Sequence, residues 1–263
     1  MRIVQTSWIP APAEPPEDTL IAAIGDVHGM ADHLDALLAA LTPILAEHAG
    51  PVELIQLGDL IDRGPAPIRA LDRMITATQN SGVRARTLRG NHEDWLLAAL
   101  DPETSPWDVR AWILEGGQST LLELGLPEGP WPDNIHRTLP DALGPARLRF
   151  LRETRLSIRL GGYLFVHAGI DPGRPLDDQR DRDLLWIRRR FLDAPPDLAR
   201  VPGVVTVHGH TPGRTQIRPH RIGVDSGAPA TGILSAVLLS GDRLRFVSAV
   251  AEDADPRALP PAS

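Results

Sequence analysis

Cysteine is absent from the chain, and this absence removes several classes of site at once. Without cysteine there are no disulfides, no zinc–thiolate centres and no cysteine nucleophile. An excess of positive charge is also missing, because 27 Lys and Arg stand against 34 Asp and Glu, for a net charge of −7. A basic surface for nucleic acid or anionic lipid is therefore not expected, and nucleic acid is not predicted as a partner.

Long hydrophobic runs are missing as well. The first residues, MRIVQTSWIPAPAEPPEDT, hold no apolar core of signal-peptide length, and no run approaches the ~20 residues that a bilayer requires. We therefore expect a cytoplasmic protein without a membrane partner, either monomeric or a weak homo-oligomer. The expected organisation is a Pro-rich lead-in over 1–19, a single domain over 20–251 and a flexible tail over 252–263.

The stretch from Leu20 to Gly29, LIAAIGDVHG, is an apolar run that ends in an Asp, a His and two glycines. A buried parallel strand has such a continuous apolar run, and α/β sheets place their chemistry at the carboxyl ends of their strands. Asp26 and His28 could thus converge on one divalent metal ion. On its own, the pair would more often be a capping Asp and a partly buried His.

The same pattern recurs along the chain. Apolar runs at 52–57, 83–88, 163–166 and 204–207 are followed by GDLIDRG, RGNHE, HAGID and HGHTP, respectively. Helices are predicted over 32–47 and 68–79, after residue 93 through Leu100, and over 183–192, with a hairpin over 156–166 and closing strands at 222–224, 233–239 and 244–250. His33 and His48 lie off the apolar stripe of the first helix and are expected to be solvated. The alternation of strands and helices predicts an α/β fold.

Carboxylate, amide and imidazole side chains thus follow five strand ends. The polar residues at these ends are Asp26, His28, Asp59, Asp62, Arg63, Asn91, His92, His167, His208 and His210. A mixed oxygen and nitrogen donor set suits a pair of Mn, Fe or Zn ions, whereas an all-oxygen set suits Mg or Ca. The sequence therefore predicts a two-metal centre.

The motifs GDVHG, GDLIDRG, GNHE, HAG and GHTP occur in the order found in the calcineurin-like metallophosphoesterases, and the chain resembles that family over about residues 20–250. The DRG after GD and the Glu after GNH are similar to the phosphoprotein phosphatase branch, which includes bacterial serine/threonine phosphatases and their diadenosine tetraphosphatase relatives. The resemblance implies a metallophosphoesterase-type β-sandwich core flanked by helices, with the metal site at the carboxyl ends of the strands.

The resemblance also implies a role for each matching residue. Asp26 and His28 would hold the first metal, Asp59 would bridge both, and Asn91, His167 and His210 would hold the second. The implied cofactor is a pair of divalent ions, with manganese preferred and iron, zinc or nickel as alternatives.

Four further residues receive catalytic or substrate-binding roles. His92 would protonate the leaving group, Asp62 would orient His92, and Arg63 and Arg188 would bind the phosphoryl oxygens. A pairing of His92 with its neighbour Glu93 is the alternative for His92. For Arg188 the alternative is a solvated basic helix face, and His208 either supports the metal ligands or only packs.

Three functions compete at this point. The first is a metal-dependent serine/threonine protein phosphatase, which would accept a phosphorylated protein or a small phosphoester. The second is a dinucleoside polyphosphate hydrolase, and the third is a non-catalytic scaffold. Residues 101–150 are predicted to form a helical insertion, either beside the site or as a plain packing subdomain. Because this insertion is net acidic, it would favour basic phosphopeptides over the polyanionic diadenosine tetraphosphate.

Overall fold

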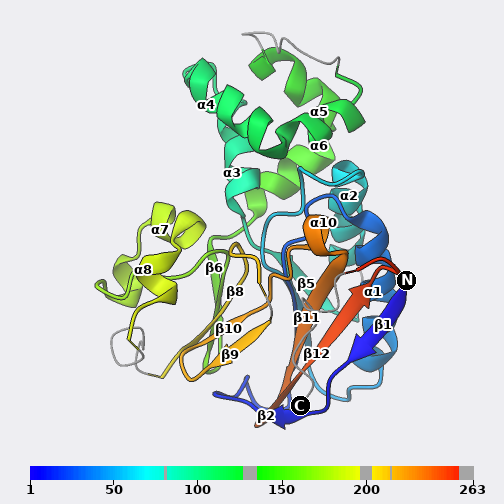
Figure 1. Ribbon diagram of the computed structural model, residues 1–263, viewed down its shortest axis with the longest axis vertical. Helices are drawn as coiled ribbons and strands as arrows, with labels where there is room; N and C mark the ends of the chain where they lie inside the picture. Colours follow the sequence, from blue (N-terminus) through cyan, green and yellow to red (C-terminus); the bar gives the residue numbers. More distant parts are fainter. Residues whose placement is uncertain (80–81, 127–134, 196–202, 214, 255–263) are drawn as a thin grey trace.

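The protein forms two β-sheets that face each other, with helices on their outer faces (Figure 1). This arrangement comes from a computed structural model, which describes residues 1–79, 82–126, 135–195, 203–213 and 215–254. The expected α/β class with a β-sandwich core is confirmed. Across the described residues, none of the helices is both long and apolar enough to cross a membrane.

The larger sheet has the strand order β1-β12-β11-β3-β4-β5, and β2 also pairs with β12. Its strands are β1 (Arg2–Gln5), β2 (Ile9–Pro10), β3 (Leu20–Ile24), β4 (Val52–Gln56), β5 (Arg84–Thr87), β11 (Ile233–Ser240) and β12 (Arg243–Val250). β3, β4 and β5 are parallel, so their carboxyl ends meet at one edge. β11 runs antiparallel to β3.

Residues of β3 alternate between two hydrophobic cores. Leu20, Ala22 and Ile24 face the core beneath the helices. Ile21 and Ala23 face the core between the two sheets. Because both faces are buried, the strand is apolar at every position rather than at every second one.

The smaller sheet has the order β6-β7-β8-β10-β9. Its strands are β6 (Ser157–Leu160), β7 (Tyr163–Val166), β8 (Val205–His208), β9 (Gln216–Arg218) and β10 (Arg221–Gly223). β6 and β7 form the expected hairpin, and β8 lies parallel to both β7 and β10. The outer face of this sheet packs against a third core that includes Leu184, Ile187 and Phe191.

The helices form three groups around the sheets (Figure 1). Their bounds are α1 (Ala31–Ala46), α2 (Pro67–Thr78), α3 (Asn91–Ala98), α4 (Pro106–Trp112), the π-helix η1 (Ile113–Gly117), α5 (Gln118–Glu123), α6 (Ile135–Glu153), the 3-10 helix η2 (Leu176–Asp178), α7 (Asp181–Trp186), α8 (Arg189–Leu192) and α10 (Ala228–Thr231). α1 and α2 cover the larger sheet. The helices between 106 and 153 form an upper lobe, and α7 and α8 form a second lobe beside the smaller sheet.

Several elements differ from the sequence prediction. β1, β2 and β9 were not predicted, and β1 and β2 place part of the 1–19 lead-in at the edge of the larger sheet. The prediction for His33 was wrong, because its side chain is buried and its Nε2 lies 3.1 Å from the Gly232 carbonyl oxygen. The outer part of the predicted tail, 255–263, lies outside the described residues.

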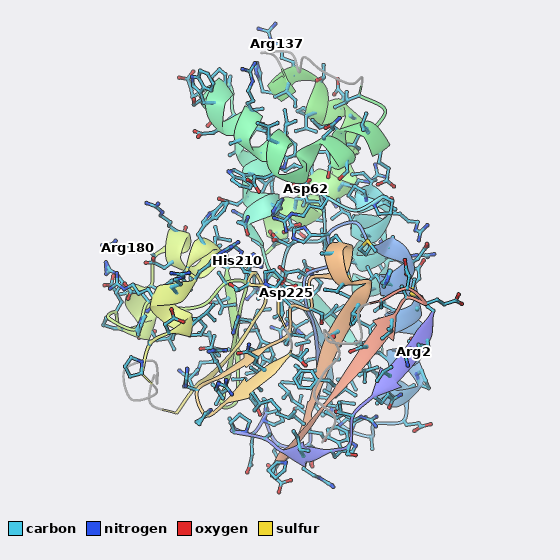
Figure 2. All side chains as sticks on the ribbon, viewed as in Figure 1. Arg2, Asp62, Arg137, Arg180, His210 and Asp225 are labelled. Carbon is cyan, nitrogen blue, oxygen red and sulfur yellow. The ribbon has the colours of Figure 1, made fainter. Side chains whose placement is uncertain are left out.

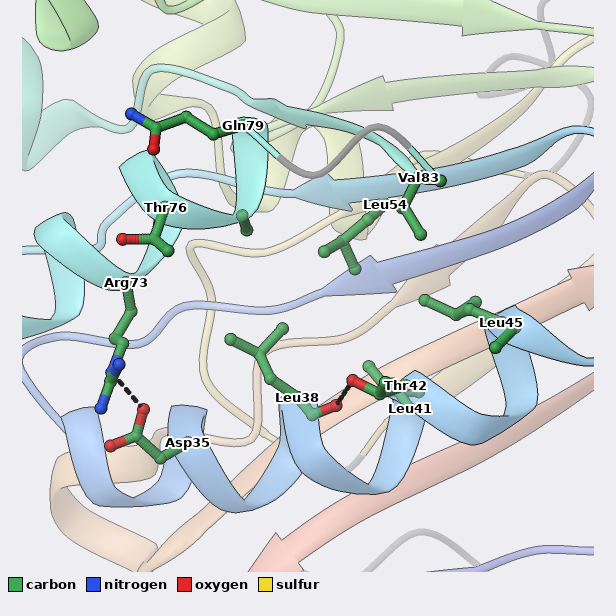
Figure 3. Close-up of a pocket in the computed structure, with 13 residues that line it drawn as sticks. Asp35, Leu38, Leu41, Thr42, Leu45, Leu54, Arg73, Thr76, Gln79 and Val83 are labelled. Carbon is green, nitrogen blue, oxygen red and sulfur yellow. Dashed lines mark hydrogen bonds and ion pairs between the residues drawn. The ribbon is translucent and has the colours of Figure 1, made fainter.

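A groove of about 630 Å³ lies in the helical layer, between α1, α2, β4 and the start of β5 (Figure 3). Leu38, Leu41 and Leu45 line it from α1, and the Asp35–Arg73 ion pair, at 2.7 Å, closes one side. The groove is therefore a gap between the packed helices α1 and α2.

Candidate metal centre

The predicted site residues converge above one end of the two sheets. Apart from Arg188, which lies between α7 and α8, they follow β3, β4, β5, β7 and β8 along the chain, and they lie between the upper lobe and the α7–α8 lobe, as the positions of Asp62 and His210 show (Figure 2). Parallel strands deliver their carboxyl ends to the same edge, which explains why residues 180 positions apart meet.

Two groups of buried donor atoms share the carboxylate of Asp59. Within the described part of the chain, these groups are His28 with Asp59 and His92, and Asp59 with His167 and His210, each with ligand atoms within 4.8 Å of one another. Asp59 Oδ2 lies 3.3 Å from His28 Nε2 and 3.4 Å from His167 Nε2. One carboxylate thus stands between two sets of imidazole nitrogens.

The orientation of the imidazoles fits metal binding. His28 Nδ1 lies 3.0 Å from the Ile61 carbonyl oxygen, and His167 Nδ1 lies 2.9 Å from that of Leu57. A carbonyl only accepts, so each Nδ1–H donates and each Nε2 keeps its lone pair directed toward Asp59. Metal-binding histidines characteristically donate their other ring nitrogen to such an acceptor.

The protonation states of His28, His210 and Asp59 fit metal binding, whereas the pKa of His167 is raised, because the charge of Asp59 more than offsets the effect of burial. Burial lowers the pKa of His28 to about 3 and lowers that of His210 as well, so both imidazoles are neutral near pH 7. Burial alone would raise the pKa of Asp59, but the imidazoles of His167, His92 and His28 hold it well below its usual range. Neutral imidazole and ionised carboxylate are the forms that bind a metal.

Asp26 and Asn91 complete the predicted ligand set from two sides. The carboxylate of Asp26 accepts a hydrogen bond of 2.9 Å from the His210 backbone N–H and lies outside the two donor groups. Asn91 Oδ1 lies 2.9 Å from His167 Nε2. Burial, followed by the carboxylates of Asp225 and Asp59, raises the pKa of Asp26 well above its usual range. Several buried carboxyls in one place fit a bound cation, which would stabilise their charged forms.

Backbone strain is concentrated at the same residues. Among the described non-glycine residues, positive φ angles occur at Asp18, His28 (44°), Asp59 (56°), Asp62 (72°), Arg63 (65°) and His210 (64°). Such angles cost free energy and persist where the surrounding structure enforces them, commonly at functional sites. All but one of these strained residues belong to the predicted site.

Two glycines allow the ligand loops to approach each other. A Cβ atom at Gly90 would collide with Asp59 Oδ1, and one at Gly209 would collide with Asp26 Oδ1. The glycines of the GNHE and GHTP motifs are therefore required because no side chain fits against the two carboxylates.

His92 belongs to a fully buried hydrogen-bond network. Its Nδ1 lies 2.7 Å from Asp62 Oδ2, and its Nε2 has no hydrogen-bond partner among the described residues. The same Asp62 oxygen accepts a hydrogen bond of 2.7 Å from Trp112 Nε1, and Asp62 Oδ1 accepts one of 2.5 Å from Thr120 Oγ1. Asp62 therefore orients His92, and the helical lobe in turn fixes Asp62 in place.

Glu93 ties the loop after β4 to the start of α3. Its carboxylate accepts backbone hydrogen bonds from Asp59 at 2.8 Å, from Leu60 at 2.8 Å and from Gly90 at 2.9 Å. The alternative that Glu93 pairs with the His92 side chain is not what the structure shows, because the imidazole bonds to Asp62 instead.

The two predicted phosphate-binding arginines lie at different donor groups. Arg63 Nη1 is 2.8 Å from His28 Nε2, and Arg188 Nε is 3.0 Å from His210 Nε2. Both side chains are otherwise exposed, so the guanidinium groups can exchange these contacts for an anion at the centre. Arg188, rather than Arg189, is the residue of its run that contacts the site.

The sequence analysis missed several residues of the site. Asp225 follows β10 as the other acids follow their strands, which is a signal that could have identified it. Trp112 and Thr120 lie 50 and 58 positions from Asp62, and no local pattern links them to it. His208 is buried and packs edge-on against Phe191, with a ring separation of 5.3 Å.

The chain belongs to the calcineurin-like phosphoesterase family, whose model matches residues 19–231. The curated relatives include symmetrical bis(5′-nucleosyl)-tetraphosphatases. That of Ralstonia nicotianae is 35% identical over 152 residues, which are 57% of this chain and 42% of the relative. That of Neisseria gonorrhoeae is 31% identical over 57% of this chain and 43% of the relative. The match thus spans less than half the length of these relatives.

Solved structures share the fold at low sequence identity. A crystal structure proposed to be a diadenosine tetraphosphatase has a TM-score of 0.61 and 22% identity, covering 89% of this chain and 95% of that one. A protein serine/threonine phosphatase from Saccharomyces cerevisiae has a TM-score of 0.55 and 16% identity, covering 92% and 86%. These similarities establish the fold alone.

Proposed function

We propose that this protein is a two-metal-dependent phosphohydrolase that cleaves the phosphoanhydride chain of a dinucleoside polyphosphate. The observation that carries the two-metal part is Asp59, whose carboxylate lies 3.3 and 3.4 Å from imidazole nitrogens of two different donor groups. A carboxylate placed in this way would hold both cations of a two-metal centre. This proposal replaces the protein phosphatase that the sequence favoured.

The substrate class rests on the relatives and on the charge beside the site. Symmetrical bis(5′-nucleosyl)-tetraphosphatases are among the matched relatives, which favours the second of the functions considered above. Arg63 and Arg188 contact the donor groups directly, so the nearest exposed charges are cationic. In the acidic insertion, Glu123 is engaged elsewhere, since it accepts the Ile68 N–H at 2.6 Å at the start of α2. This carboxylate is therefore occupied at α2 and is not available to repel a polyanion.

Each ligand of the proposed centre has a defined place. Asp26, His28, Asp59, Asn91, His167 and His210 would hold the two ions, with manganese as the preferred metal. When bound, such ions supply an activated water nucleophile at neutral pH and neutralise charge on the phosphoryl oxygens.

The protein's own side chains carry the remaining steps. Arg63 and Arg188 would bind phosphoryl oxygens and orient the scissile group. His92 would donate its Nε2 proton to the leaving phosphate oxygen, because its Nδ1 is occupied by Asp62 and its Nε2 is free. The pKa of His92 is raised: burial alone would lower it, and the carboxylates of Asp59 and Asp62 more than offset that effect, which favours the protonated form.

A substrate panel tests the proposal. The manganese-loaded protein is assayed with diadenosine tetraphosphate and with phosphoserine and phosphothreonine peptides of basic and neutral sequence. We expect a higher kcat/KM for the dinucleotide at both low and high salt, where surface electrostatics differ. A preference for phosphopeptides would return the protein to the phosphatase class, and activity on neither substrate would contradict both.

A further inference from the structure

A second cavity adjoins the metal centre on the side of the α7–α8 lobe. It has a volume of about 450 Å³ and is lined by Arg89, Asp94, Asp181, Arg182 and Trp186, with Leu156 and Leu185 at its apolar side. This volume lies within the range of small-molecule sites, which is ~300 to 1,000 Å³. The roles proposed above leave this cavity without an occupant.

Trp186 connects this cavity to the metal centre. Its ring lies 6.1 Å from that of His210 and 4.5 Å from that of Trp95. Trp95 in turn lies 5.4 Å from the ring of His92. A molecule bound on Trp186 would therefore lie close to the proposed metal ligand His210. Only Trp95 separates Trp186 from the proposed proton donor His92.

The chemistry of the lining is that of a nucleoside phosphate site. The partly exposed indole of Trp186 offers a surface on which a planar base can stack. Arg182 is exposed, and Arg89 is half-buried with its Nη1 3.5 Å from Asp94 Oδ1. Arginines attract phosphate, whereas the carboxylates of Asp94 and Asp181 can accept hydrogen bonds from ribose hydroxyls or a base amino group.

We infer that this cavity, here called the Trp186 pocket, binds one nucleoside end of the substrate while the phosphate chain crosses the metal centre. The inference rests on the proposed function and adds the location of a specificity site. In a symmetrical cleavage, the nucleoside is joined to the reacting phosphorus through one intervening phosphate. Trp186 lines the pocket and also lies beside His210, so the pocket adjoins the place where the nucleoside diphosphate product would leave the metal centre.

Product inhibition tests the pocket independently of the substrate panel. The full-length, manganese-loaded protein hydrolyses p-nitrophenyl phosphate, and the inhibition constants of adenosine diphosphate and inorganic pyrophosphate are compared at constant free manganese. Both inhibitors offer a diphosphate to the metals, but only one carries a nucleoside. We expect adenosine diphosphate to inhibit at the lower concentration.

Variants of the pocket then separate stacking from structural effects. Trp186→Leu should raise the inhibition constant of adenosine diphosphate by roughly 5- to 150-fold, the range for loss of a base–aromatic stack, with little change for pyrophosphate. Trp186→Phe should retain most of the affinity because it keeps an aromatic surface. Arg182→Gln should weaken adenosine diphosphate, whereas the matched control Arg180→Gln, outside the pocket lining, should not.

Two results would overturn the inference. The first is equal inhibition by adenosine diphosphate and pyrophosphate in the unmodified protein. The second is an equal rise for both inhibitors in Trp186→Leu, which would show that Trp186 acts only through His210. The inhibition assay does not require diadenosine tetraphosphate to be a substrate, so failure of the pocket and failure of the proposed function are distinguishable.

Discussion

At the scale of single residues, Asp59 belongs to both donor groups, so its removal should affect both metal sites together. We predict that Asp59→Asn retains less than half of the bound manganese and loses more activity than Asp26→Asn, because it removes a charge that lies between two cations. Metal content measured after gel filtration, beside kcat, checks this. The exposed residue Asp177 supplies a control variant, Asp177→Asn, and normal metal content in Asp59→Asn would contradict the bridging role.

For His92 we predict a loss in kcat of ~10²- to 10⁴-fold on substitution by Asn, as is typical for removal of a general acid. The loss should be smaller for p-nitrophenyl phosphate than for phenyl phosphate, because a good leaving group needs less protonation. Steady-state rates on the two esters provide the measurement. Equal losses on both would assign His92 a structural role.

Asp225 should make the stability of the metal-free protein depend on pH. Burial, and then the carboxylate of Asp59, raises the pKa of Asp225 to about 6. A carboxyl group whose pKa is raised in the folded protein contributes its full stability when the pH is below the pKa of the unfolded state. This contribution is lost as the pH rises through about 6. Asp225→Asn should therefore be more stable than the unmodified protein by roughly 2 to 3 kcal/mol near pH 7.5.

This gain should shrink to a small fraction near pH 4, because Asp225 is then protonated in the folded state and about half protonated in the unfolded state. Urea unfolding in excess chelator at the two pH values measures the difference. A gain of the same size at both pH values would show that packing, rather than ionisation, is responsible.

The sequence indicated the individual ligands because each followed an apolar strand and had glycine beside it. His28, Asp59 and His210 all lie at such strand ends, and the structure brings them together. Asp225 also follows a strand, but Val224 and Ser226 rather than glycine stand beside it, so the pattern was not recognised. His33 was misassigned because an apolar stripe does not reveal a buried carbonyl, here that of Gly232, which lies 199 residues away.

At the scale of elements, the upper lobe should act on catalysis through Asp62. We predict that Trp112→Phe and Thr120→Val each lower kcat by about 10- to 100-fold with little change in KM, as expected for loss of a hydrogen bond to a buried carboxylate. Trp107→Phe is the matched control, since Trp107 lies on the same helix and is 75% exposed. The kinetic constants and the pH profile of kcat provide the measurement.

A lobe that only packs would give a different result. Trp112→Phe would then lower the unfolding midpoint and leave kcat and its pH profile unchanged. The double variant Trp112→Phe/Thr120→Val separates these cases further. Substitutions that act through the same carboxylate, that of Asp62, are not additive in their effects on kcat.

The long strands and helices could be predicted from periodicity, and the short or irregular ones could not. β3 is apolar throughout, and β11 is apolar apart from Ser235 and Ser240, because both faces of these strands are buried. β1 and β2 carry largely exposed side chains and are held by pairing with β12, so the sequence offers no hydrophobic pattern there. The predicted single helix over 183–192 is interrupted, since Arg188, with φ −129°, separates α7 from α8.

At the scale of the whole molecule, activity should depend on the metal ions. We predict that exhaustive chelation abolishes p-nitrophenyl phosphate hydrolysis and that manganese restores it better than magnesium or calcium, because the donor set mixes imidazole with carboxylate. Titration of the metal-free protein with each ion measures this. Full activity after verified metal removal would exclude a metal-dependent mechanism.

Family membership could be predicted from five ordered motifs, whereas substrate preference could not. The charge of the 101–150 segment was summed without knowing where its side chains point. In the fold, Glu123 binds the start of α2 and Arg147 pairs with Asp72 at 2.7 Å, both away from the centre. The arginines nearest the metals, Arg63 and Arg188, come from outside that segment.

The pairing of β3 with β11 joins residues about 210 positions apart, such as Ala236 with Ile24. During synthesis, β3, which leads into Asp26 and His28, therefore leaves the ribosome long before its antiparallel neighbour β11 exists. Contacts of such separation form slowly, and unpaired strand edges are prone to aggregation in the meantime. A nascent chain should thus acquire catalytic competence only after β11 has been released, which makes the onset of hydrolysis a marker for completion of the sheet.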